Sequence, residues 1–397
     1  MMVKETTGYD WINSQPQLAA LIEQLASVKR IALDTEFIGE GVYMPRLCLI
    51  QITADNLVVP ALVDPLANLD WKGLAKIFAD EKIEKVLHSP RQDLEIVHQV
   101  FGVVLKPVFD TQLAAAFLGY GDQPALARML LDELGVVHEK GERYTDWAVR
   151  PLSNGQLVYA AQDVADLLRL RDQLAEKLKA AKRYDWFLEE SVTANRSEVF
   201  IRNDDDAWQR VGDKRGLRRK ELIVLRSLAA MRERLARNAN RPREYIIADR
   251  IIVQLARSQP QNEADLSRMR GWKGANAATI EAILEAIQDG RSRNDLVISD
   301  DNGTAPTLET MALADLLAAW VKVISQRKLI AGSLLAVRSE IDAFARWGAE
   351  TPTKPMPPVR FTKGWRWEFL GKDLASLATG KKTIGLSSDS EHVLSIK

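Results

Sequence analysis

The chain has 397 residues, of which 46% are hydrophobic and 27% charged, and its 54 Lys and Arg balance 54 Asp and Glu. This composition is typical of a globular protein that is too long for one ordinary core, so two or three domains are expected. A single cysteine, Cys48, excludes an intramolecular disulfide framework and a cysteine-based metal site, and no apolar run is long enough for a signal core or a membrane span. A reducing, cytoplasmic location is the expectation.

The first part of the chain alternates short apolar strands with helical patterns. Strands are predicted over residues 30–37, 46–53, 61–65, 85–89 and 108–111, and helices over 71–79, from 94 onward, and then to about 178. This order predicts an α/β domain whose sheet begins as a meander. An acidic stretch near 201–208 follows the domain, which we therefore predict to comprise residues 1–200.

The remainder carries almost no strand signal. Residues 206–290 have helical spacing of apolar side chains, and a polar run rich in Asp, Asn, Gly and Ser follows as a linker. A second helical segment is predicted over 305–397. Charge is segregated here, because eleven Lys or Arg and only two acids lie between Lys214 and Arg243. Such a run is either a phosphate-binding surface or a set of solvated helix faces.

The predicted strand "RIALDTEF" ends in two acids, Asp34 and Glu36. Side chains alternate along a strand, so both carboxylates point to one face, about 7 Å apart, and repel unless cations lie between them. Divalent ions such as Mg²⁺ prefer oxygen ligands of this kind. Downstream, Asp93 follows a strand and loop at the start of a helix. Taken alone, Asp93 is equally explained as a helix cap.

A third acidic pattern lies on a helix that follows a predicted capping box, Ser153 with Gln156. Tyr159 and Asp163 are four residues apart and therefore share one face, away from the apolar stripe. Taken alone, they are also explained as a solvent-facing pair. Asp166 shares the face and is a rival metal ligand.

Together, D-x-E at a strand end, an Asp about 60 residues later and Y-x-x-x-D on a later helix resemble the DEDD superfamily of 3'-to-5' exonucleases, which have a ribonuclease H-like fold. The histidine subtype has His five residues before the last Asp, where this chain has Val158, so the resemblance is to the tyrosine subtype. The resemblance implies a set of metal ligands and a catalytic tyrosine: Asp34, Glu36, Asp93, Asp163 and Tyr159.

Longer motifs narrow the resemblance. "DTQLAAAFLGY", "ERYTDWAVRPLS" and "QLVYAAQDV" are similar to the bacterial ribonuclease D family, and "NANRPREYIIAD" with "LSRMRGW" resembles its helicase-and-RNase-D C-terminal (HRDC) domain. Gln92 departs from the family, which often has an acid there, but it is not a ligand position. A second, degenerate HRDC domain is suggested mainly by "GWRWEFLGKDLASLATG".

The resemblance implies a monomeric, cytoplasmic exoribonuclease without a membrane partner. It would use two divalent ions, Mg²⁺ or Mn²⁺, to remove 3' nucleotides from precursor tRNA and other small structured RNAs as nucleoside 5'-monophosphates. By the same resemblance, Asp34 would contact both ions, Glu36 and Asp163 the nucleophile-side ion, and Asp93 the leaving-group ion. Tyr159 would orient the attacking water, because a phenol with a pKa near 10 is a poor base at neutral pH.

Contacts to the nucleic acid are predicted at five positions. Aromatic Phe37 and Trp147 are candidates for stacking on bases, although an aromatic residue after a buried strand is commonly a core residue. Candidate phosphate ligands are Lys140, Arg143 and Arg150. No histidine has a partner at metal-ligand spacing, and His88 is interpreted as structural.

Two other functions are compatible with parts of the pattern. The same acids cleave DNA, so a DNA repair or proofreading exonuclease is an alternative, although no helicase or polymerase motif accompanies them. A non-catalytic RNA-binding scaffold is a second alternative, and the intact set of four acids and Tyr159 argues against it.

Overall fold

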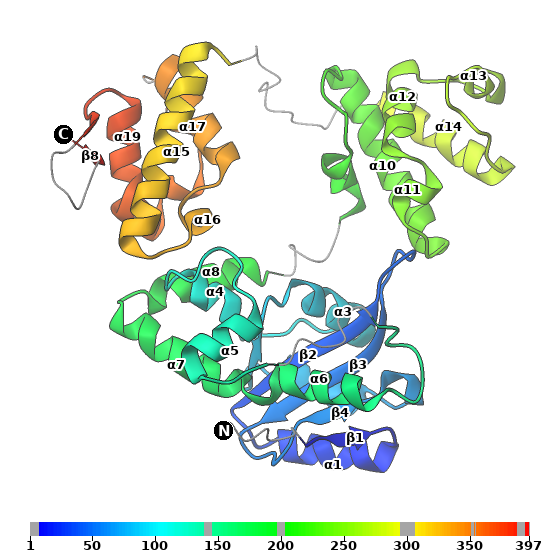
Figure 1. Ribbon diagram of the computed structural model, residues 1–397. Helices are drawn as coiled ribbons and strands as arrows, with labels where there is room; N and C mark the ends of the chain where they lie inside the picture. Colours follow the sequence, from blue (N-terminus) through cyan, green and yellow to red (C-terminus); the bar gives the residue numbers. More distant parts are fainter. Residues whose placement is uncertain are drawn as a thin grey trace.

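The structure is a computed structural model that describes residues 8–138, 145–196, 203–293, 306–350, 353, 355–386 and 394–396. Three parts follow one another along the chain (Figure 1). An α/β part extends to residue 196, a helical part covers 203–293, and a C-terminal part begins at 306.

The α/β part is built on a six-stranded mixed sheet with the order β1-β4-β3-β2-β5-β6. The predicted meander is confirmed, because β3 pairs antiparallel with both β2 and β4, while β5 and β6 continue the sheet in parallel with β2. The strands are β1 Asp10–Ile12, β2 Arg30–Ile38, β3 Arg46–Ala54, β4 Ala61–Val63, β5 Glu84–Leu87 and β6 Val108–Asp110.

Helices cover both faces of this sheet, so its strands are apolar on both sides. Ile31 and Leu33 of β2 face a core formed with α1 Gln15–Leu25, α2 Lys72–Ala79 and α3 Arg91–Phe101. The intervening Ala32 faces the opposite side, where α6 and α7 pack. The remaining helices of this part are α4 Thr111–Ala116, α5 Leu126–Leu134, α6 Asn154–Ala165, α7 Leu167–Ala180 and α8 Tyr184–Ala194. A 3-10 turn, η1, spans Pro65–Ala67.

The observed elements differ from the predicted ones at two places. Strand β1 and helix α1 precede the first predicted strand, although Ser14 at the N-cap and Pro16 in the first turn are start signals for a helix. Helix α3 begins at Arg91 rather than at residue 94, which places Asp93 inside its first turn.

Residues 203–293 form a helical unit with its own core around α10, as predicted. Its elements are η2 Asp204–Arg210, α10 Arg219–Asn238, α11 Arg243–Ile246, α12 Asp249–Ser258, α13 Glu263–Ser267 and α14 Ala277–Ser292. Four of the eleven basic residues of the charged run form ion pairs inside this unit: Arg226, Arg232, Arg237 and Arg243. Those that remain exposed are Arg215, Arg218, Arg219, Lys220, Arg234 and Arg241.

The tip of the β2–β3 hairpin contacts this helical unit (Figure 1). The Tyr43 hydroxyl donates to Oε2 of the buried Glu233 at 2.6 Å, and the Met44 amide donates to Oδ1 of Asn240 at 2.9 Å. The strand that carries Asp34 and Glu36 therefore leads directly into an interdomain contact.

The C-terminal part contains the predicted helices and shares a core with α4, α5, α7 and α8. Trp365 stacks on Trp186 of α8 with ring centroids 4.7 Å apart, and the Ala331 amide donates to the carbonyl of Ala116 at 2.8 Å. Its helices are α15 Leu308–Lys328, α16 Gly332–Leu335, α17 Arg338–Glu350, η3 Arg360–Thr362, α18 Gly364–Arg366, the π-turn η4 Trp367–Gly371 and α19 Lys372–Ala378. The structure adds a two-stranded sheet that was not predicted, β7 Ile384–Leu386 with β8 Leu394–Ile396.

Candidate active site

Strand β2 presents Asp34 and Glu36 to the face of the sheet on which α6 packs. Alternation along the strand fixes this, since Ala32 lies on that face while Leu33 faces α1 to α3. Asp163 on α6 approaches from above. One carboxylate oxygen from each of the three residues lies within 4.8 Å of the others.

The position of Asp163 on α6 is fixed by a capping box at the N-terminus of the helix. Ser153 and Gln156 form the predicted capping box, with the Gln156 amide donating to Ser153 Oγ and the Ser153 amide to Gln156 Oε1. Asp163 follows near the end of the helix and is only 8% exposed, so the solvent-facing alternative is wrong. The rival Asp166 lies beyond the last residue of α6 and pairs with exposed Arg169 at 2.5 Å, away from the acidic group.

Asp93 lies on the other side of the sheet and is not among the three acids whose oxygens converge within 4.8 Å. It lies in the first turn of α3, where its Oδ1 accepts a 2.5 Å hydrogen bond from the Thr35 hydroxyl between the two acids of β2. Asp93 is 7% exposed. A helix cap alone does not account for this contact, because Thr35 brings the carboxyl to the strand that carries Asp34.

The grouping of acids is electrostatically unfavourable in the absence of cations. Burial, followed by repulsion from Asp93, Asp163 and Glu36, raises the pKa of Asp34 well above its usual range. Burial also raises the pKa of Asp93 to about 6, although the bond from Thr35 opposes this shift. A set of clustered, partly desolvated carboxylate oxygens is what hard divalent cations require, so the residues fit a metal site.

Two further residues at the site were missed by sequence reasoning. The Nε2 atom of His138 lies 3.1 Å from Oδ1 of Asp163, although no histidine has a partner at metal-ligand spacing in the sequence. Gln51 of β3 lies directly opposite Asp34 in the strand register and is fully buried. Neither polar atom of its amide has a hydrogen-bond partner among the residues that the structure describes. Neither residue belongs to a motif with a characteristic spacing.

The structure gives Arg150 a different role from phosphate binding. Its Nε and Nη2 atoms donate to the two carboxylate oxygens of Asp64, at 2.8 and 2.6 Å, and Nη1 donates to the carbonyl of Trp147 at 2.9 Å. The guanidinium thus ties the segment after α5 to the turn that follows β4. We therefore correct Arg150 from a substrate ligand to a structural residue.

The two aromatic candidates are also core residues. Trp147 is 3% exposed and packs with β3, β4 and α6. Phe37 is half-buried and packs toward the core under α1 to α3, on the face opposite the acids. Trp147 is therefore too buried to stack on a base, whereas stacking by the half-buried Phe37 stays a prediction. The phosphate ligands predicted at Lys140 and Arg143 lie outside the described residues.

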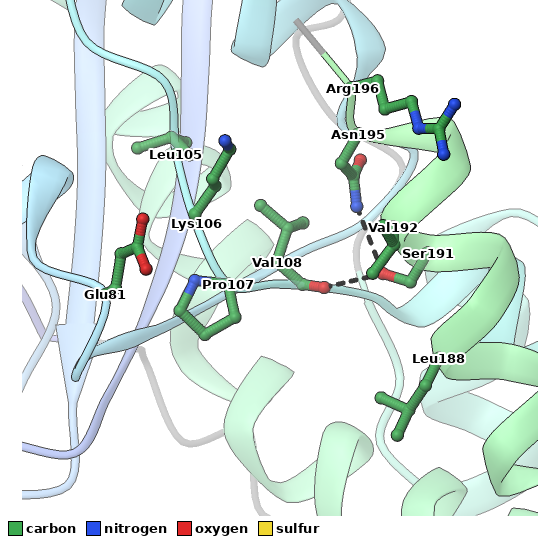
Figure 2. Close-up of a pocket in the computed structure, with 10 residues that line it drawn as sticks. All are labelled: Glu81, Leu105, Lys106, Pro107, Val108, Leu188, Ser191, Val192, Asn195 and Arg196. Atoms are coloured by element: carbon green, nitrogen blue, oxygen red, sulfur yellow. Dashed lines mark hydrogen bonds between the residues drawn. The ribbon is translucent and has the colours of Figure 1, made fainter.

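A separate cavity of about 560 Å³ lies between the β6 edge of the sheet and α8 (Figure 2). Ser191 donates to the carbonyl of Val108 on one wall, and Leu188 and Val192 line another. None of the acids described above lines this cavity. The chemistry of the site is therefore located at the end of β2 and not in the cavity.

Comparison with known proteins agrees with this description. A family model described as 3'-5' exonuclease matches residues 9–179, and one described as HRDC domain matches residues 221–287. The fold and the acidic site thus define a 3'-to-5' exonuclease with an appended HRDC domain.

The chain belongs to the ribonuclease D family. It is 31% identical to ribonuclease D of Bartonella henselae, covering 95% of this chain and 92% of that one, and 34% identical to that of Acidiphilium cryptum, covering 93% of each. The crystal structure of Escherichia coli RNase D, described as an exoribonuclease involved in structured RNA processing, matches with a TM-score of 0.75 at 29% identity. That match covers 94% of this chain and 99% of that one.

The predicted class of enzyme is therefore confirmed. The protein is a metal-dependent 3'-to-5' exoribonuclease, a hydrolase that acts on RNA. No helix among the described residues has the length and apolar character needed to cross a bilayer.

Proposed function

We propose that Asp34, Glu36, Asp93 and Asp163 hold two divalent ions, Mg²⁺ or Mn²⁺, and that the site trims the 3' ends of precursor tRNA and other small structured RNAs. The observation that carries the proposal is the convergence of carboxylate oxygens from Asp34, Glu36 and Asp163 within 4.8 Å. Asp93 supports the proposal, since its carboxyl is close enough to Asp34 for the two to repel each other.

Each residue has a distinct task in this proposal. Bound ions would supply Lewis-acid charge for an in-line attack of water on the terminal phosphodiester. Asp34 is repelled by all three other acids and would be the central ligand, in contact with both ions. Glu36 and Asp163 would bind the nucleophile-side ion, and Asp93 the leaving-group ion. Tyr159, one turn before Asp163 on α6, orients the attacking water by hydrogen bonding rather than by removing its proton.

The preference for structured RNA rests on the rest of the chain. The relative from Escherichia coli is described as acting in structured RNA processing. In this chain the exposed basic residues at the start of α10 are suited to the phosphates of an RNA body, while the single-stranded 3' end enters the acidic site. We propose that the protein does this as a cytoplasmic monomer and releases nucleoside 5'-monophosphates.

The direct test incubates the purified full chain with 3'-extended tRNA and with a matched single-stranded DNA, in Mg²⁺ or EDTA. We expect Mg²⁺-dependent release of mononucleotides from the RNA, and its loss in Asp34→Asn. The control Asp55→Asn removes a half-exposed acid that pairs with Arg30 and should retain activity. Loss of activity in EDTA that Mg²⁺ and Mn²⁺ both fail to restore would contradict the metal assignment. Equal rates on DNA would contradict the tRNA assignment and favour the DNA exonuclease.

The role of the helical part is tested by removing its exposed charge. Replacing Arg218, Arg219 and Lys220 together with Ala should weaken binding of structured RNA. It should also reduce the slope of log affinity against log salt by about one for each phosphate that the variant no longer neutralises. The measurement is fluorescence anisotropy of labelled RNA with the full chain, because the C-terminal part shares its core with the exonuclease domain and is unsuited to isolation.

A matched control removes three exposed lysines from the region of α2, on the opposite side of the sheet from the acids. The triple replacement of Lys72, Lys76 and Lys82 with Ala changes net charge equally. If both triple variants lower the salt slope equally, the effect is one of net charge and the proposed surface on α10 is wrong.

A further inference from the structure

His138 occupies a buried position beside the acidic group. It follows α5, and its Nε2 atom lies at ion-pair distance, 3.1 Å, from Oδ1 of Asp163. The His138 side chain is 7% exposed and that of Asp163 is 11% exposed. The contact between the two side chains is therefore well shielded from water.

The same imidazole also contacts Tyr159. The two rings meet edge to face, with centroids 5.7 Å apart and planes at 90°. Tyr159 is also 6.3 Å from the ring of Trp147, tilted by 38°. Two aromatic side chains that precede and follow residues 139–146 in the chain therefore pack near Tyr159. Both contacts of His138 fall on residues of α6 that belong to the proposed site.

We propose that His138 is a positioning residue of the nuclease site, which holds Asp163 and Tyr159 in the arrangement that metal loading and water orientation require; the inference rests on the proposed function of those two residues. Asp163 lies among like charges that favour its rotation away from Asp34 and Glu36. A fixed nitrogen partner opposes that rotation. Partners of this kind orient metal-binding groups in general, and their loss costs about 10- to 100-fold in metal affinity or activity.

Direct metal ligation by His138 is not what the geometry supports. The group of residues whose ligand atoms all lie within 4.8 Å of one another contains Asp34, Glu36 and Asp163 but not His138, although His138 is among the described residues. Its Nε2 atom lies 3.1 Å from one member of the group, Asp163. The role that remains is to act through Asp163 and Tyr159.

The test uses full-length His138→Leu, which removes both ring nitrogens, and His138→Gln, whose amide retains a donor near the position of Nε2. We expect His138→Leu to bind Mn²⁺ about tenfold more weakly in the metal-free protein, measured by the electron paramagnetic resonance signal of free Mn²⁺. It should lower kcat by about 10- to 100-fold with KM for RNA nearly unchanged, and His138→Gln should recover part of both losses. His98→Gln, on the half-buried side of α3, is the matched control and should change neither.

Three outcomes would overturn the proposal. Unchanged Mn²⁺ affinity and kcat in His138→Leu would show that His138 positions nothing. Tighter Mn²⁺ binding in that variant would show that the imidazole competes with the metal. A nitrogen hyperfine coupling to bound Mn²⁺ that is present in the natural sequence and lost in His138→Leu would make His138 a ligand instead.

Asp163→Asn separates this inference from the proposed function. If Asp163→Asn retains metal binding and activity, the proposed site itself is wrong. If Asp163→Asn loses both while His138→Leu is normal, only the inference fails. Thermal unfolding of His138→Leu monitors its fold, and if that variant is unfolded, failure of His138→Gln to differ from His98→Gln in kcat and Mn²⁺ affinity refutes the positioning role.

Discussion

The four acids proposed as metal ligands differ in how the fold supports each carboxyl. Asp93 receives the Thr35 hydroxyl, and Asp163 is approached by the His138 ring. Asp34 is instead repelled by the other three acids, and burial together with this repulsion raises its pKa well above its usual range. Bound cations would therefore favour its charged form.

Two acids three residues apart, Asp163 near the end of α6 and Asp166 just beyond it, give a sharp test of the site. Asp163→Asn should lower activity about a thousandfold, because the loss of several kcal/mol of transition-state stabilisation has this size. Asp166→Asn should change activity by less than about twofold, since Asp166 pairs with exposed Arg169. The measurement is the rate of nucleotide release at saturating Mg²⁺. Equal losses in the two variants would contradict the assignment of Asp163.

Replacement of two buried glutamines by Leu should affect the stability of the fold differently. Gln51 is fully buried with no partner for either amide atom among the described residues, so Gln51→Leu should leave stability unchanged or raise it by about 1 kcal/mol. Gln156 caps α6 and donates to Thr145 Oγ1, so Gln156→Leu should cost about 1–3 kcal/mol. Urea denaturation of the metal-free protein measures both. A loss of stability in Gln51→Leu comparable to that in Gln156→Leu would show that Gln51 is hydrogen-bonded in solution.

Prediction from sequence worked best for residues inside a spaced motif. Strand alternation places Asp34 and Glu36 on one face of β2, and the resemblance carried by Y-x-x-x-D pointed to Asp163, whose carboxylate converges with theirs. The roles of residues that depend on a partner far away in the chain could not be predicted in this way. Arg150 is bound by Asp64, which is 86 residues away, and a lone arginine carries no sign of such a partner.

A histidine directly after strand β5 joins that strand to α4 and to the loop that follows α4. His88 Nδ1 lies 2.8 Å from the hydroxyl of Thr111, the first residue of α4, and Nε2 lies 2.9 Å from the carbonyl of Pro124 in the following loop. Because that carbonyl only accepts, Nε2 carries the proton of a neutral ring. Burial lowers the pKa of His88 to about 4. The structural role predicted for His88 is consistent with these contacts.

This histidine should make the fold sensitive to acid. Its pKa in the folded chain is depressed, so the unfolded chain binds the extra proton first, and stability falls as pH drops from about 6.5 through 4. The full loss is about 3 kcal/mol. The carboxyls of Asp93 and Asp110, with pKa raised to about 6, act in the opposite direction, because they favour the folded state as pH falls.

The measurement compares urea denaturation of the natural sequence and His88→Gln at pH 7 and pH 4.5. Contributions from Asp93 and Asp110 cancel in the comparison because both proteins contain them. His88→Gln is expected to lose about 2 kcal/mol less between the two pH values. Parallel losses would show that His88 is already protonated in the folded protein.

Elements were predicted reliably where the apolar pattern was long or strongly periodic, as in β2, β3 and α10. Predictions were poorest at ends. The pattern of α6 runs on to Leu168 without a break, but the chain turns at Asp166, where φ is −108° and ψ is 4°. The following α7 is directed by packing on β2, β5, α4 and α5. Such a turn depends on tertiary contacts rather than on the local sequence.

At the scale of the whole molecule, domain order and domain packing follow different rules. The HRDC unit follows the exonuclease domain in the chain, yet its core is separate and the described contact is at the tip of the β2–β3 hairpin. The C-terminal part is more distant in the chain but continues the exonuclease core through Trp365, Trp186 and Phe117. Amphipathic patterns predict that these helices bury a face, but they do not specify the surface that receives it.

The shared core predicts that the exonuclease domain and the C-terminal part unfold together. Trp365 is 7% exposed, stacks on Trp186 and lies 5.6 Å from Phe117, so Trp365→Ala should cost about 3–5 kcal/mol. Removal of the Trp365 ring leaves a cavity next to α4 and α8. Amide hydrogen exchange should therefore accelerate in those two helices of the exonuclease domain as well as in α18 and α19. Exchange in α10 and α14 should not change, since their core contains no residue of this cluster.

The reciprocal variant is Trp272→Ala, in the HRDC unit, where Trp272 packs against the core around α10. It should accelerate exchange in α10 and α14 and leave α4 and α8 as they were. Mass spectrometry of the full chain reads out both variants on the same peptides. If Trp365→Ala accelerates exchange only within residues 306–396, the C-terminal part is an independent domain docked on the exonuclease. Acceleration that extends into α4 and α8 requires one cooperative unit formed by two segments on either side of the HRDC domain.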